Sequence, residues 1–153
     1  MTLTQENKRL LLMDLSSRLP YGVKVCFKYD VLMGETTEEL TPSLIEKFNN
    51  LSGELYQLKP FLRPLSSMTE EERKELRNIL CWNFAPEDCP IFENDFSVTT
   101  FHSYNEREQN EYYDMSTMLT YFNFLNTNHF DYRNLIPMGL ALPATEGMYN
   151  LKK

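Results

Sequence analysis

The spacing of hydrophobic residues changes at a Pro-Tyr-Gly sequence near residue 21. Before it, four leucines recur at helical spacing: Leu11, Leu12, Leu15 and Leu19. Thr2 and Gln5 have the spacing of a capping box, so we predict an amphipathic helix over about residues 3–18. After it, apolar and polar residues alternate in VKVCFKY, residues 23–29. A period of two predicts a half-buried strand.

The next fifty residues predict two helices separated by an extended segment. Thr41 and Pro42 form a helix start, and the apolar positions up to residue 51 fit a helical face, although a short strand over residues 31–34 is also compatible with the pattern. Residues 54–65, ELYQLKPFLRPL, contain two prolines that cannot donate to a ladder, which predicts an edge strand or an extended surface segment. Thr69 and Glu72 then form a capping box at the start of the clearest helix.

The second half of the chain predicts a strand in FSVTTFH, residues 96–102, followed by helices. Asp114 can cap a helix that ends near residue 126. Its expected apolar stripe consists of Met118, Leu119, Phe122 and Leu125. Asp131 occupies an N-cap position for a short helix through Leu135 and Ile136 that Gly139 would close.

These elements favour an α+β fold: a small, strongly bent antiparallel sheet, either open or of barrel type, flanked by helices. The chain has 153 residues, of which 42% are hydrophobic. A chain of this length buries about 70% of its unfolded surface. No repeat or linker interrupts it, so we expect a single domain over residues 1–153.

The sequence contains no strong signature of a catalytic, metal or nucleotide site. Cys26, Cys81 and Cys89 are odd in number and lack a CxxC pair, which argues against a disulfide framework or a zinc ribbon. Five glycines form no phosphate-binding loop. We therefore expect no metal and no cofactor. The longest aliphatic run is too short for a membrane span or a signal peptide, so we expect a cytoplasmic protein without a membrane partner.

Charge is distributed unevenly along the chain. Residues 83–114 contain eight acids and one base, which accounts for the whole net charge of −7, and the remaining 14 acids and 14 bases balance. This distribution disfavours nucleic-acid binding, because no basic footprint for phosphates is present. A weaker hypothesis is a nucleic-acid module built on Lys24, Lys28, Lys59 and Arg63. The sequence leaves open whether the chain forms a homo-oligomer.

Aromatic residues lie among the acids of this segment. Aromatic side chains near carboxylates suit the binding of a basic protein surface, although acids in such a loop can also serve only solubility. We identify these residues as the candidate binding surface: Trp82, Phe92, Glu106, Glu108, Glu111, Tyr112 and Tyr113.

A second candidate site is NHFDYRNL, residues 128–135, together with Arg63. His129 could act as a general base oriented by Asp131, with Tyr132 and Arg133 beside them. The interpretation that we favour is structural: Asp131 caps the next turn, and the other polar groups bond to nearby carbonyls or carboxylates.

Three blocks of the sequence resemble a family of uncharacterised small proteins from gut Bacteroidales and their phages and prophages. The blocks are RLPYGVKV at residues 18–25, LKPFLRPLSSMTEEERKEL at 58–76 and NHFDYRNLIPMGLALPATEGMYN at 128–150. The resemblance implies a genomic setting in mobile elements and no particular mechanism.

The leading functional hypothesis is a non-enzymatic interaction or accessory protein of a phage or mobile element that binds a host or phage protein through residues 83–114. The alternative is a small hydrolase or a nucleotide-signal binder that uses His129, Asp131, Tyr132 and Arg133.

Overall fold

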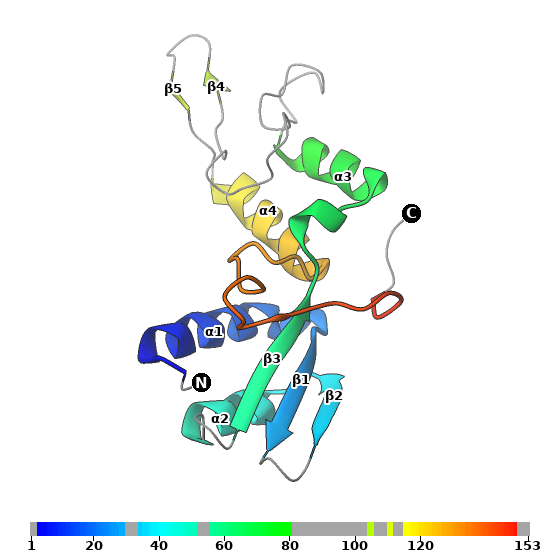
Figure 1. The fold of residues 1–153 in the computed structure, drawn as a ribbon. Helices are drawn as coiled ribbons and strands as arrows, with labels where there is room; N and C mark the ends of the chain where they lie inside the picture. The colour runs from blue at the N-terminus through cyan, green and yellow to red at the C-terminus, as the bar shows by residue number, and fades with distance from the viewer. Residues whose placement is uncertain are drawn as a thin grey trace.

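A four-stranded sheet with two helices beside it forms one end of the molecule, and two further helices lie beyond it (Figure 1). The computed structural model describes residues 3–29, 34–51, 56–80, 104–105, 110–111 and 115–149. In these residues the predicted α+β class is confirmed. The strand order is β2-β1-β3-β6, and the sheet is open, not closed into a barrel.

The N-terminal helix begins later than its predicted capping box. Helix α1 spans Gln5–Arg18, and Thr4, not Thr2, caps it by accepting a hydrogen bond from the backbone N–H of Asn7. Leu11 and Leu15 of this helix are buried in the main core. Strand β1, Lys24–Tyr29, follows as predicted.

Strand β2, Glu35–Glu39, was not predicted, because its sequence ETTEE has no apolar residue and all five residues are exposed. It pairs antiparallel with β1, with Cys26 opposite Thr37. The alternative strand over residues 31–34 lies almost wholly outside the described residues. Helix α2, Pro42–Leu51, begins at the predicted proline.

Strand β3, Tyr56–Leu62, contains Pro60 and was predicted to be an edge strand or an extended segment. It is an edge strand over part of its length only. It pairs antiparallel with β1 from Tyr29↔Tyr56 to Val25↔Pro60. On its other side β6, Leu142–Pro143, runs parallel to it and pairs only with Phe61 and Leu62. The expectation of a wholly antiparallel sheet was therefore wrong, and in the described residues Tyr56–Pro60 has a strand on one side only.

Two further helices pack on each other beyond the end of β3 (Figure 1). Helix α3, Glu70–Leu80, carries the predicted capping box: the backbone N–H of Thr69 donates to Glu72, and that of Glu72 donates to the Thr69 hydroxyl. Helix α4 spans Met115–Thr127. Its buried apolar residues are Tyr121, Phe124 and Leu125, so the prediction is confirmed for Leu125. Phe122 is partly buried against the same core, whereas the prediction for Leu119 is wrong, because it is 58% exposed.

The C-terminal segment returns from α4 across the sheet to β6 and on to residue 149 (Figure 1). The predicted short helix after Asp131 is wrong, because residues 135–139 form turns. Asn134 and Gly139 both have positive φ values, 62° and 75°, which interrupt a helix. The predicted strand at residues 96–102 lies outside the described residues, and β4 and β5, Tyr104–Asn105 and Asn110–Glu111, pair as a two-stranded ribbon.

Candidate functional site

The backbone brings three members of the predicted NHFDYRNL site together at the end of β3. The N–H of Arg63 donates to the carbonyl of His129 at 2.8 Å, and the N–H of Asp131 donates to the carbonyl of Arg63 at 2.8 Å. Arg63 and Phe130 thus form an isolated parallel bridge. Backbone hydrogen bonds alone therefore attach the segment after α4 to β3.

The side chain of Arg63 is fully engaged by its own protein. Its two terminal nitrogens donate to both carboxylate oxygens of Glu72, at 2.7 and 2.8 Å. They also reach the carbonyls of Asn128 and Ser67 at 3.2 Å, and the guanidinium lies 4.3 Å from the ring centroid of Phe130. Bidentate pairing of this kind satisfies a buried arginine.

Burial alone would raise the pKa of Glu72, but hydrogen bonds from Arg63 and Thr69 outweigh it and lower the pKa. Glu72 is therefore a charged structural group at neutral pH and not a proton donor. This buried pair joins the start of α3 to the end of β3.

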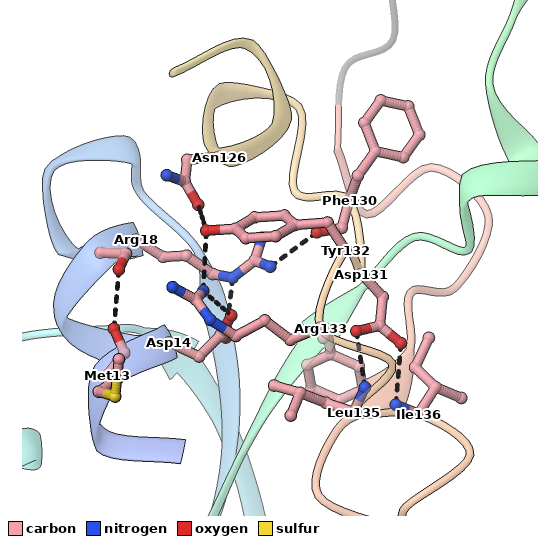
Figure 2. Close-up of polar contacts among 12 residues, drawn as sticks. Met13, Asp14, Arg18, Asn126, Phe130, Asp131, Tyr132, Arg133, Leu135 and Ile136 are labelled. Atoms are coloured by element: carbon pink, nitrogen blue, oxygen red, sulfur yellow. Dashed lines mark hydrogen bonds and ion pairs between the residues drawn. The ribbon is translucent and has the colours of Figure 1, made fainter. Parts of the chain in front are cut away.

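Asp131 accepts hydrogen bonds from two backbone N–H groups, Leu135 at 2.8 Å and Ile136 at 2.9 Å (Figure 2). The prediction that this carboxylate caps the following residues is confirmed, although it caps a series of turns and not a helix. Each of its oxygens is aimed at the backbone. A catalytic partnership would need one of them on the imidazole of His129.

Replacing Asp131 with alanine should lower the free energy of unfolding by about 2 kcal/mol, because a cap is lost and the buried N–H of Leu135 is left unpaired. Asp131→Asn keeps one oxygen acceptor and should cost roughly half as much. Urea unfolding monitored by circular dichroism measures both. An alanine variant as stable as the wild type would contradict this role.

Tyr132 and Arg133 belong to a second network, which is centred on Asp14 of α1 (Figure 2). Arg133 donates to Asp14 and to the Tyr132 hydroxyl, both at 2.8 Å, and that hydroxyl donates to Asn126 at 2.8 Å. Arg18 donates to the other Asp14 oxygen at 2.8 Å. One carboxylate thus holds two arginines.

Arg18 is fully buried and connects α1 to the C-terminal segment. A terminal nitrogen donates to the carbonyl of Phe130 at 2.7 Å, and the guanidinium lies 5.0 Å from the ring centroid of Tyr132. Its other terminal nitrogen is buried and has no hydrogen-bond partner among the described residues. The cluster is a cross-link between elements, with its charges directed inward.

His129 lies in a left-handed turn, with φ 61°, and its ring stacks on Tyr149 at a centroid distance of 3.8 Å. Burial, together with the positive charges of Arg18, Arg63 and Lys24, lowers its pKa to about 4. The ring is therefore neutral at pH 7 and weakly basic. Only 8% of the residue is exposed, so a substrate has little access to it.

Stability should fall as the pH is lowered from 6.5 to 4. The unfolded chain takes up the proton of His129 near pH 6.5 and the folded protein only near pH 4, so the folded state loses about 3 kcal/mol through this window. Urea unfolding at several pH values measures the loss. His129→Asn should flatten this dependence, since asparagine tolerates positive φ. His102 is present in both the wild type and the variant, so its contribution cancels when their pH dependences are compared. Equal pH dependence of stability in the two proteins would contradict the role given to His129.

Tyr149, which the sequence did not single out, closes a gap between two strands. Its hydroxyl accepts a hydrogen bond from the N–H of Lys24 at 2.9 Å and donates to the carbonyl of Phe61 at 2.8 Å. Lys24 and Phe61 lie one position beyond Val25↔Pro60, the last pair of the antiparallel ladder. The hydroxyl bridges β1 and β3 where their direct pairing ends.

Sequence reasoning also missed the acidic partners in both networks. Asp14 and Arg18 had a visible signal, the i, i+4 spacing of opposite charges. Glu72 was recognised only as a capping residue, and nothing local marked Asn126 or Tyr149. No group of three potential metal ligands occurs in the part of the chain that the structure describes.

The candidate binding surface lies outside the described residues, apart from the backbone of Glu111 in β5. Its other members are Trp82, Phe92, Glu106, Glu108, Tyr112 and Tyr113. The segment that contains them connects α3 to α4, whose apolar faces pack on each other through Leu76, Tyr121 and Phe124.

The chain matches no protein-family model, no curated protein and no solved structure. Among the described helices, none is long and apolar enough to cross a membrane.

Proposed function

We propose that this chain is a non-enzymatic binding protein that recognises a basic surface on a protein partner through residues 83–114. The observation that carries the proposal is that the polar groups of the competing site are already bonded within the protein. The functional groups of Arg63, Asp131, Tyr132 and Arg133 are all bonded to the protein itself. Their chemistry is used to hold three parts of the chain together.

Charge supports the acidic segment as the binding surface. Residues 83–114 carry the entire net charge of −7, and the scaffold outside them is neutral. An acidic segment with interspersed aromatic residues complements a basic partner, and its field accelerates association. Helices α3 and α4, which pack on each other, precede and follow this segment along the chain.

The resemblance of three sequence blocks to proteins of gut Bacteroidales and their phages suggests the setting. In that setting the chain acts as an accessory protein of a phage or mobile element, and its partner is a host or phage protein. This part of the proposal rests on the resemblance alone.

The alternative, a small hydrolase or a nucleotide-signal binder, would require Arg63, Asp131, Tyr132 and Arg133 to leave their present partners. The Nδ1 atom of His129 has no hydrogen-bond partner among the described residues, but the residue is only 8% exposed. Asp131 would have to release two backbone N–H groups, and Arg63 would have to leave a buried carboxylate. Backbone N–H groups and a carboxylate that are left buried without a partner lower the stability of the fold. No distance in the described residues favours this function.

Reversal of Glu106, Glu108 and Glu111 to lysine should abolish capture of the partner, with a change of less than about 0.5 kcal/mol in stability, because charges on a solvated binding surface contribute little to folding. Capture is measured by pull-down on the immobilised protein, and stability by thermal unfolding. Capture by the wild type should also weaken as salt is added.

The matched control reverses three exposed scaffold acids, Glu6, Glu46 and Glu146, and changes the net charge equally. It should retain capture. If both triple variants lose capture equally, net charge alone accounts for binding. If the variant at residues 106, 108 and 111 loses capture because it unfolds, the proposed surface is refuted.

A further inference from the structure

The uncovered side of β3 faces a cavity that neither network uses. Because β6 reaches only Phe61 and Leu62, the strand has no partner on that side over Tyr56–Pro60 in the described residues. A cavity of about 300 Å³ lies here, between α1, α2, β3 and the turn before β6. This volume is at the lower end of the range for small-molecule pockets, about 300–1,000 Å³.

The lining of the cavity is mainly apolar. Its apolar side chains include Leu3, Leu11, Phe48, Tyr56, Leu58 and Leu140. All of these except Leu3 are buried. Met138 also lines the cavity and is 44% exposed. Such a surface favours a hydrocarbon chain, which leaves water on binding.

Polar atoms also make up a large part of the lining, and the charge of its described residues has one sign. Asn7 and Gln57 contribute amides, and Lys59 is the only charged residue among the described residues of the lining. Lys8 and Lys24 bond to carbonyls and Lys74 pairs with Glu71, whereas the ammonium group of Lys59 makes no such bond to a described residue. A cation that has no ion pair with a described residue, at a mainly apolar cavity, complements an anionic headgroup.

We propose that this cavity binds an amphipathic monoanion, a medium-chain carboxylate whose tail lies among Leu11, Phe48 and Leu140 and whose carboxylate lies at Lys59. The two features together define the ligand class, because the apolar lining selects a tail and the single cation selects one negative charge. This site is separate from residues 83–114 and does not depend on the function proposed for them.

An extended peptide that pairs with β3 is the competing occupant, and the geometry disfavours it. The carbonyl of Leu62 accepts from the N–H of Ala144, so Leu62 faces away from β1. Leu58, four residues earlier, has the same orientation, and its N–H and C=O point to the uncovered side. However, Leu58 is only 1% exposed, so a pairing strand could not reach these groups without displacing the side chains that cover them.

The test is titration of the full-length protein with sodium octanoate, followed by calorimetry and by amide chemical shifts. We expect saturable binding that shifts the amides of Gln57–Lys59 and Gly139–Leu140. The neutral probe 1-octanol has the same tail and should bind more weakly, and acetate, which lacks the tail, should not bind at the same concentrations. Reversal of the acids at 106, 108 and 111 should leave octanoate binding unchanged, which separates this proposal from the previous one.

Two matched variants make the test specific. Lys59→Gln should weaken octanoate binding about tenfold, the loss expected for one charge-assisted contact, and should leave 1-octanol binding unchanged. Lys47→Gln removes the same charge from an exposed position on α2 that does not line the cavity, and should change neither. The proposal is overturned if octanoate does not saturate, if both variants weaken it equally, or if a capped alternating peptide of leucine and glutamate binds at β3 while octanoate does not.

Discussion

Replacing Glu72 with alanine should lower the free energy of unfolding by about 3–5 kcal/mol, because it leaves the charge of Arg63 buried without a counter-charge. The side chain of Arg63 is 5% exposed and that of Glu72 is fully buried. The substitution also removes the reciprocal capping bond to Thr69. Urea unfolding monitored at 222 nm measures the loss.

Glu71 is the matched control for this experiment. It is the preceding residue of α3, is 51% exposed, and pairs with Lys74 at 3.4 Å on the surface. Glu71→Ala should change stability by less than about 1 kcal/mol, as is typical of exposed pairs. Similar losses for the two variants would show that the Arg63–Glu72 pair does not hold the helix pair to the sheet.

Asp14→Ala should be equally destabilising, by about 3–5 kcal/mol, because Asp14 is the only carboxylate bonded to the fully buried Arg18 in the described residues. The substitution also releases Arg133, which connects α1 to the C-terminal segment. The midpoint of chemical unfolding should fall accordingly, with the slope unchanged.

A double variant separates the loss of charge from the loss of packing. Asp14→Ala combined with Arg18→Met removes the stranded cation and retains most of its hydrophobic length, so it should be more stable than Asp14→Ala alone. Glu6→Ala, at an exposed position of the same helix, serves as the control and should have little effect. If the double variant is less stable than Asp14→Ala, burial of an unpaired charge is not the cause.

Local signals in the sequence predicted the elements whose boundaries are set by neighbouring residues. The box of Thr69 and Glu72 fixed the start of α3, and Pro42 fixed that of α2. Elements that depend on distant partners were missed. Strand β2 has no apolar residue and exists through its pairing with β1, and β6 has two residues and is defined by its contact with β3.

The candidate site shows the same limit. The capping role of Asp131 was predicted because its partners lie four and five residues away. Asp14, the carboxylate partner of Arg133, lies 119 residues away, and the Phe130 carbonyl bonded to Arg18 lies 112 residues away, so no spacing rule finds either contact. Periodicity likewise does not reveal that Asn126 and Tyr149 complete these contacts.

The three blocks that carry the resemblance meet in space, which could not be inferred from any one of them. The first block supplies Arg18 and Lys24, the second Phe61 and Arg63, and the third the carbonyl of Phe130 and the hydroxyl of Tyr149. Residues of all three blocks therefore meet at one junction in the fold. This placement explains why polar residues in these blocks need not belong to a ligand site.

The Tyr149 bridge can form only after residue 149 has been synthesised. The hydroxyl joins residues that precede it by 125 and 88 positions. A growing chain on the ribosome contains β1 and β3 before this tyrosine emerges, so the bridge between Lys24 and Phe61 is added only after residue 149 is available. Contacts over such separations form late and slow folding. Nascent chains of this protein should therefore lack this bridge until residue 149 has left the ribosome, although β1 and β3 can pair directly before then.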